Sequence, residues 1–273
     1  MKIKVFFLIF LFQFFVSCSS YEKYKNNIDF YNDPDIFHRS MQKLTDIIVY
    51  DIFSPPVASR IYVYPSIAAY EVLINDYPNY KSLSGQINGL NSIPKPDFNK
   101  EYSFPIASIY AFVNVGKDLI FSENKILSFQ DELFNEFQEK GIPRDILERS
   151  IDYGLLVANH IKMWYAKDNY KQTRSFPKYT IQRDDEESWK PTPPDYMEGI
   201  EPHWNKIRTL VVDSSNQFMI KPPPEFSLDK NSIFLKDLIE VYEIGNNLSD
   251  EEKEIASFWD CNPYVSHHKG HAM

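Results

Sequence analysis

The segment 57–74 constrains this chain more than any other, because it is apolar on almost every side of a helix. Its charged exceptions are Arg60 and Glu71, and most of the intervening side chains are aliphatic or aromatic. A helix without a broad polar face has to be covered by other helices. The pattern therefore predicts a central, buried helix in an all-α protein, with a kink expected at Pro65.

Six further segments carry helical periodicity and recognisable end signals. The expected helices span residues 34–53, 106–121, 123–140, 144–167, 232–245 and 250–260. Asp33 followed by Pro34 is typical of a helix start, and Ser249 with Glu252 predicts a capping box. Gly154 weakens the helix that holds it unless another backbone approaches closely, so we expect a helix crossing there.

Between residues 168 and 227 the helical periodicity is lost. Seven of the 18 prolines of the chain lie between Pro191 and Pro224. A loop of this length is usually either functional or disordered, and its indole and phenol rings favour order because they need specific partners. We therefore expect an ordered Pro/Trp-rich segment that forms the wall of a site, with Trp189, Trp204 and Trp259 at least partly buried.

The N-terminus has the pattern of an export signal, a positive start followed by an apolar run over residues 5–16. This run is too short to span a bilayer, which takes about 20 residues. Residues 15–18 then resemble a lipobox. We expect a signal peptide over 1–17, a lipidated tether over 18–32 attached at Cys18, and a protein anchored to the membrane in the bacterial cell envelope. Cleavage without lipidation and an uncleaved anchor are the alternatives.

Charge and cysteine content exclude some classes of partner and site. The formal net charge is −9, which would repel the phosphates of a nucleic acid. Cys261 is the one cysteine after Cys18, so the folded part cannot form an internal disulfide, and we interpret Cys261 as a buried small residue. The acidic run 184–187 lacks the spacing of a calcium loop and is interpreted as a solvated loop.

Two groups of charged residues could carry chemistry. His203, Lys206 and Arg208 place three potential cations close together, where they could hold an oxyanion or pair with neighbouring carboxylates at the surface. On the central helix, Arg60 and Glu71 are too far apart to pair with each other. They are expected to form separate structural ion pairs or to be partly exposed, or Arg60 lines an anion pocket.

The C-terminal residues include three histidines, His267, His268 and His271. His267 and His271 would share one face of a helix, a common spacing for two metal ligands, but Gly270 and the lack of a nearby carboxylate or thiol make a poor site. We expect no metal site in this chain, with adventitious binding as the alternative at this end.

Several blocks of the sequence resemble one family. These blocks are residues 54–71, 164–170, 189–194, 201–208 and 258–263. Over residues 33–273 the chain resembles the N-terminal part of bacterial lipoproteins of the vanadium-dependent haloperoxidase and type 2 phosphatidic acid phosphatase superfamily. The resemblance implies an incomplete all-α helical bundle of the haloperoxidase/acid-phosphatase type. It also implies that the full-length family oxidises halide with peroxide or hydrolyses phosphomonoesters, and that its pocket holds vanadate or a transient phosphate.

The motifs on which these activities depend in the family do not occur in this sequence. The family uses Lys-x6-Arg-Pro, Ser-Gly-His, and an Arg and a His a few residues apart; the nearest fragments here are residues 206–208 and 270–271. The resemblance therefore implies no catalytic residue and no cofactor in this chain. The candidate pocket-lining residues are Arg60, His203, Lys206 and Arg208.

We expect the chain alone to be inactive and to associate either with a missing C-terminal half or with further copies of itself. Two alternatives remain open: a non-catalytic envelope lipoprotein that acts as a binding or structural module, and a truncated gene product without a role of its own.

Overall fold

The computed structural model describes residues 21–193 and 196–260, and the chain divides into two compact units between Lys171 and Gln172. Within the described ranges all regular structure is helical and no strand is found. None of the described helices is both long enough and apolar enough to cross a membrane.

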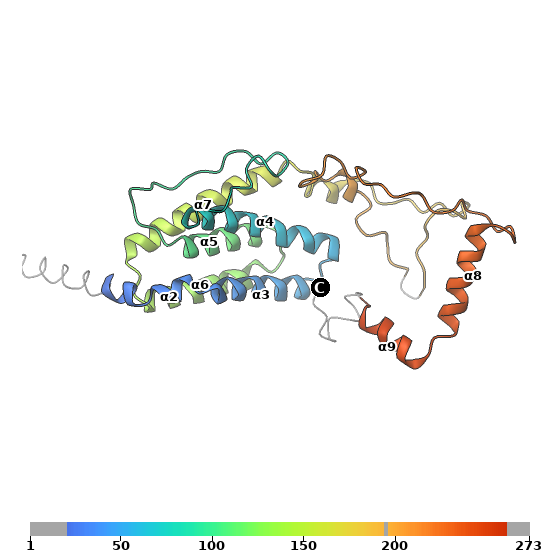
Figure 1. Ribbon diagram of the computed structural model, residues 1–273, viewed down its shortest axis with the longest axis horizontal. Helices are drawn as coiled ribbons and strands as arrows, with labels where there is room; N and C mark the ends of the chain where they lie inside the picture. Colours follow the sequence, from blue (N-terminus) through green and yellow to red (C-terminus); the bar gives the residue numbers. More distant parts are fainter. Residues whose placement is uncertain (1–20, 194–195, 261–273) are drawn as a thin grey trace, which may run out of the picture. The chain divides into compact units, whose positions relative to one another are not determined.

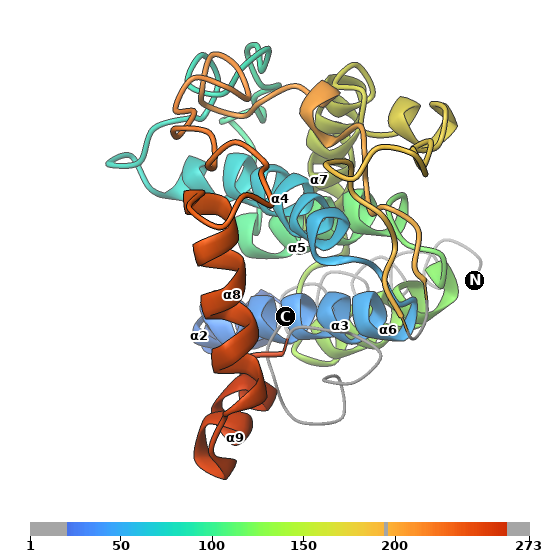
Figure 2. The same cartoon turned by 90° about the vertical axis from the view of Figure 1, so that its right-hand side faces the viewer.

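The first unit is a helical bundle. Its elements are α2 (Ile28–Asn32), α3 (Pro34–Tyr50), α4 (Pro55–Leu73), the 3-10 turn η1 (Ile74–Asp76), α5 (Phe104–Lys117), α6 (Glu123–Glu139) and α7 (Arg144–Tyr165). Figures 1 and 2 show α2, α3 and α6 in one layer and α4, α5 and α7 in the other. The bounds agree closely with the sequence-based prediction, because caps and prolines mark most of the helix ends.

Two helices form the centre of this bundle. α4 buries residues on most of its circumference, including Ile61, Tyr64 and Val72, as the sequence predicted. α5 is covered even more completely, with Ile106, Phe112 and other residues on every side shielded from solvent. A bundle with two such helices needs covering helices on both sides of them, which α3, α6 and α7 supply.

Gly154 marks the crossing of α7 over α5. A Cβ atom at this position would lie 2.3 Å from the carbonyl oxygen of Ala107, which belongs to the backbone of α5. Since backbone atoms cannot move aside as a flexible side chain can, only glycine fits here. The predicted helix crossing is confirmed.

The prediction of a polar tether over residues 18–32 is wrong for the part that the structure describes. Residues 21–26 and α2 are helical, and Tyr24 and Tyr31 are each only 2% exposed. The hydroxyl of Tyr31 donates to the carbonyl oxygen of Phe137 at 3.0 Å, which fixes this segment against the end of α6. The segment is polar overall, but Tyr24 and Tyr31 are two helical turns apart and lie on one face of it. Burial of these two rings packs the segment against the bundle.

A second correction concerns the central helix. Glu71 is completely buried, but its partners are a hydroxyl and a backbone amide rather than a cation. Ser82 Oγ donates to one carboxylate oxygen at 2.8 Å, and the backbone N–H of Leu83 donates to the other at 2.6 Å. These bonds satisfy the buried carboxylate and hold the irregular connection between η1 and α5 against the bundle.

The second unit is mostly irregular chain followed by two helices. Its elements are η2 (Gln172–Ser175), η3 (Trp204–Lys206), α8 (Ile233–Asn246) and α9 (Asp250–Phe258). The predicted capping box at the start of α9 is confirmed, because Ser249 and Glu252 exchange hydrogen bonds between side chain and backbone. Neither α8 nor α9 buries any of its residues.

Candidate functional site

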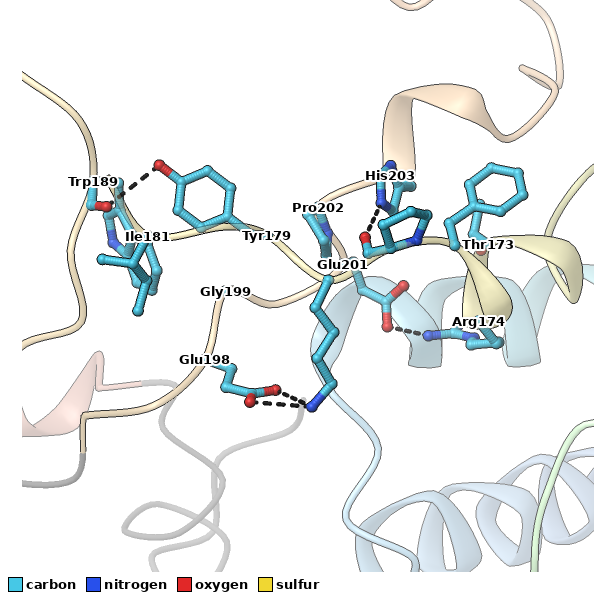
Figure 3. Close-up of a pocket in the computed structure, with 13 residues that line it drawn as sticks. Thr173, Arg174, Tyr179, Ile181, Trp189, Glu198, Gly199, Glu201, Pro202 and His203 are labelled. Carbon is cyan, nitrogen blue, oxygen red and sulfur yellow. Dashed lines mark hydrogen bonds and ion pairs between the residues drawn. The ribbon is translucent and has the colours of Figure 1, made fainter. Parts of the chain in front are cut away.

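A pocket of about 280 Å³ lies within the second unit (Figure 3), between the chain that follows η2 and the chain that leads into η3. We call it the Trp189 pocket. Its lining residues are Thr173, Arg174, Phe176, Pro177, Lys178, Tyr179, Ile181, Trp189, Glu198, Gly199, Glu201, Pro202 and His203. The segments are held by ion pairs, by ring contacts and by side-chain hydrogen bonds to backbone carbonyls, since no α-helix or strand spans them.

The charged side chains of the Trp189 pocket are arranged in two ion pairs. Arg174 binds the carboxylate of Glu201, and Lys178 Nζ lies 2.8 Å from Glu198 Oε2. Each pair joins the two segments that border the pocket (Figure 3). Because each cation is matched by a carboxylate, the pocket carries little net charge and is poorly suited to a multiply charged anion.

His203 is the sequence-predicted residue that lines this pocket. Its Nε2 lies 2.6 Å from the carbonyl oxygen of Pro177, and since a carbonyl can only accept, Nε2 carries the hydrogen. The imidazole also meets the ring of Phe176 edge to face, with centroids 5.3 Å apart. These contacts orient the ring and leave Nδ1 as the nitrogen with a lone pair in the neutral form.

An aromatic pair forms the other end of the pocket. The rings of Tyr179 and Trp189 meet edge to face at 5.6 Å, with Ile181 nearby in Figure 3. A Cβ at Gly199 would lie 3.6 Å from Trp189 Cζ3, so the backbone of Gly199 packs against the indole. This end can accept a flat apolar group.

The expected burial of the three tryptophans is only partly met. Trp204 is half-buried, but Trp189 is 49% and Trp259 is 70% exposed. The ordered wall therefore exists around Trp189 and Trp204 and does not extend to Trp259. Trp259 directly follows α9, where the ring of Phe258 meets its indole edge to face at 5.2 Å.

The other predicted pocket residues are not in the lining of the Trp189 pocket. Lys206 is the last residue of η3, and Arg208 follows two positions later. Arg60 belongs to α4 in the first unit, where its Nη1 donates to the hydroxyl of Tyr64 at 3.2 Å. Glu198 and Glu201 are two of the neighbouring carboxylates that could pair with these cations, and they bind Lys178 and Arg174.

A buried polar cluster in the first unit was not foreseen. Tyr64 donates to the carboxylate of Asp168, which is 1% exposed and also accepts from the backbone N–H of Tyr170 at 2.9 Å. Burial, with a smaller contribution from Asp168, raises the pKa of Tyr64 far above its ordinary range. Tyr64 therefore stays protonated and acts as a hydrogen-bond donor. The helical spacing of Arg60 and Tyr64 was visible in the sequence, but nothing local linked them to Asp168.

The Trp189 pocket does not fit vanadate or phosphate. Either anion needs several cationic donors without competing carboxylates, and the cations of the Trp189 pocket are already paired with Glu198 and Glu201. Within residues 21–193 and 196–260 no group of three or more His, Cys, Asp or Glu side chains is arranged to hold a metal ion. The C-terminal histidines lie outside the described residues.

Comparison with solved structures places this architecture in a family. The chain matches the crystal structure described as the first bacterial vanadium-dependent iodoperoxidase, with 49% sequence identity and a TM-score of 0.80. The match covers 85% of this chain and 57% of that chain. No family model matches the sequence, and no curated protein matches it.

This identity extends over both the bundle and much of the second unit, which is far more than a shared helical architecture alone produces. The match also means that the chain spans only 57% of the length of the solved iodoperoxidase. The all-α fold, the sequence blocks and this structural match together show that the chain belongs to the vanadium-dependent haloperoxidase and type 2 phosphatidic acid phosphatase superfamily.

Proposed function

We propose that this chain is the helical, non-catalytic part of a vanadium-dependent peroxidase that oxidises iodide. The observation that carries the proposal is the 49% identity, over 85% of this chain, to a protein described as a vanadium-dependent iodoperoxidase. Iodide is the halide named for that protein, so it is the first substrate to test. The role of the present chain is to provide the packed bundle and the ordered second unit on which the rest of the enzyme is built.

We place the vanadate-binding residues in the part of the family's chain that this sequence does not span. Two observations support this placement: the family's three oxyanion-binding motifs do not occur in the sequence, and the cations of the Trp189 pocket are neutralised by Glu198 and Glu201. Bound vanadate would supply a Lewis-acidic centre for peroxide. The residues Arg60, His203, Lys206 and Arg208 remain candidates for supporting such a pocket from this side.

We further propose that the protein is exported and anchored to the membrane of the cell envelope by a lipid on Cys18. The support is the positive start, the short apolar run and the lipobox-like residues 15–18, which together are typical of a bacterial lipoprotein signal. Cys18 lies outside the described residues. The helical packing of residues 21–32 implies that any tether between lipid and bundle is very short.

The test is to complete the chain. A fusion of residues 18–273 to the region of the solved iodoperoxidase beyond the match should oxidise iodide with peroxide in the presence of vanadate, followed as triiodide formation. Removal of vanadate should abolish this activity, and its return should restore it. A folded fusion that hydrolyses phosphomonoesters but never oxidises iodide would overturn the proposed substrate, and a folded fusion with neither activity would overturn the proposed function.

The aromatic end of the Trp189 pocket favours one second candidate, a non-catalytic envelope lipoprotein that binds a flat apolar ligand. Tyr179 and Trp189 present their rings there without a charged side chain between them. Quenching of tryptophan fluorescence by a small phenol, lost in Trp189→Ala, would support this candidate. Unchanged fluorescence at saturating phenol would exclude it.

A further inference from the structure

Helix α8 presents a broad apolar face that none of the described residues of its own unit covers. Leu238, Ile239, Val241 and Tyr242 are 48%, 45%, 71% and 71% exposed. At about 100° per residue these side chains share one side of the helix with Leu235, and Asp237 and Glu243 border this side at its two edges. We call the five apolar residues the α8 face. Exposed apolar faces of this kind mark interaction surfaces.

Local contacts fix the start of α8, but they do not make the helix stable in water without tertiary packing. Ser232 caps its first turn by accepting from the backbone N–H of Leu235, and the rings of Phe226 and Phe234 pack at 5.0 Å. The helix has only 14 residues, and a helix of this length is marginal in water without tertiary packing. A covering partner is therefore required for a well-formed α8.

The charge around the α8 face restricts what this partner can be. Within α8 and α9 the acidic residues are Asp237, Glu240, Glu243, Asp250, Glu251, Glu252 and Glu254, against the basic residues Lys236 and Lys253. A second copy would bring the same acidic excess, and an anionic lipid surface would also be repelled. The surface fits a partner with an apolar stripe bordered by Lys or Arg.

We propose that the α8 face is the docking surface for an amphipathic, basic helix from the remaining part of the haloperoxidase chain. This inference rests on the proposed function, because it takes its partner from the family's own polypeptide. The solved iodoperoxidase has chain beyond the 57% that this sequence matches, so the family supplies a partner of sufficient length. The partner's helix covers Leu235, Leu238, Ile239, Val241 and Tyr242 and places its cations beside the carboxylates of α8.

The experiment mixes the full chain with a separately expressed fragment, the region of the solved iodoperoxidase beyond the match. Analytical ultracentrifugation measures whether a complex forms and its stoichiometry, and hydrogen exchange measures how far the α8 amides are protected. We expect a one-to-one complex, strong protection of α8 only in the mixture, and weaker binding at high salt. Leu238→Glu should weaken binding and raise the dissociation constant by about tenfold or more. The matched control is Leu156→Glu on α7, a residue that is 50% exposed and should leave binding unchanged.

Three outcomes would overturn the inference. They are self-association of the chain that protects α8, protection of α8 by phosphatidylglycerol vesicles alone, and a mixture in which α8 stays unprotected. The readout needs neither vanadate nor turnover, so it is separate from the test of function. A complex with protected α8 but without iodide oxidation in the fusion would refute the proposed function and keep the docking surface. Iodide oxidation by the fusion with α8 unprotected in the mixture would keep the proposed function and refute the docking surface.

Discussion

Tyr64 donates its phenolic hydrogen to the carboxylate of Asp168, and the two residues are 0% and 1% exposed. The bond joins the middle of α4 to the residues that follow α7, and the ring of Tyr64 stacks on Tyr165 at 4.7 Å. A buried carboxylate that accepts from a hydroxyl and a backbone amide is fully dependent on these donors. The pair is therefore a specific element of the stability of the first unit.

Tyr64→Phe should lower the unfolding free energy of the first unit by about 1–3 kcal/mol, because it keeps the ring but leaves a buried carboxylate oxygen without its donor. Urea denaturation followed by circular dichroism measures the change. Tyr62→Phe on the same helix is the control. Its hydroxyl bonds to Thr45 in a half-buried position, and its loss should cost less than about 1 kcal/mol. Equal effects of the two substitutions would contradict the importance of the Tyr64–Asp168 pair.

Gly154→Ala should destabilise the bundle by about 1–3 kcal/mol or more, since the new methyl group would meet the backbone oxygen of Ala107 and force α5 and α7 apart. Thermal unfolding measures the loss. Gly245→Ala in α8 is the opposite case, because a Cβ there meets nothing within 4 Å. It should increase helicity, as alanine favours a helix over glycine by about 0.5–1 kcal/mol. A neutral Gly154→Ala would show that the helices do not cross so closely.

Local signals in the sequence account for much of the fold, and long-range contacts account for what was missed. The helix crossing at Gly154 was predictable from a simple steric rule. The capping box at Ser249 was predictable because it depends only on neighbours at the start of one helix. The partners of Tyr64 and Glu71 were not, since Asp168 is 104 positions from Tyr64 and the residues that bind Glu71 lie in an irregular loop. Such pairs depend on how the helices pack.

The candidate site shows the same division. The aromatic and proline content of the second unit predicted an ordered wall, and His203 was recognised because its residue type and neighbours suggested an oxyanion pocket. The pairing of Arg174 with Glu201 and of Lys178 with Glu198 could not be read from the sequence. Each pair joins residues at least 20 positions apart. Together the two carboxylates neutralise the charge of Arg174 and Lys178, so the pocket is not strongly cationic.

The unfolding free energy should fall at alkaline pH because buried tyrosines must ionise, and Tyr24 is the tyrosine chosen for the test. Burial, with a smaller contribution from Glu101, raises the pKa of Tyr24 from 10.0 to about 12. The folded state therefore holds this proton more tightly than the unfolded state. Its contribution is complete below pH of about 10 and is lost as the pH rises through about 12. Tyr24→Phe should reduce the steepness of the decline in unfolding free energy between these values, and an unchanged slope would contradict it.

Lipid attachment should depend on Cys18. The wild-type protein is expected in the membrane fraction of cells, and Cys18→Ala should either move it to a soluble fraction or block its processing. Metabolic labelling with a fatty acid and mass spectrometry of the mature N-terminus identify the modification. Soluble wild-type protein with a mature N-terminus elsewhere would refute the anchor.

The most direct test of the account is a turnover assay of residues 18–273 alone, with vanadate, peroxide and iodide, and separately with a phosphomonoester. Removing a single preorganised donor from an oxyanion site costs roughly 100- to 1000-fold in rate. A chain in which the family's three oxyanion-binding motifs do not occur should therefore show no turnover above background in either assay. Vanadate-dependent iodide oxidation by this chain, abolished by His203→Ala or Arg208→Ala, would contradict the account and place the active site within the second unit.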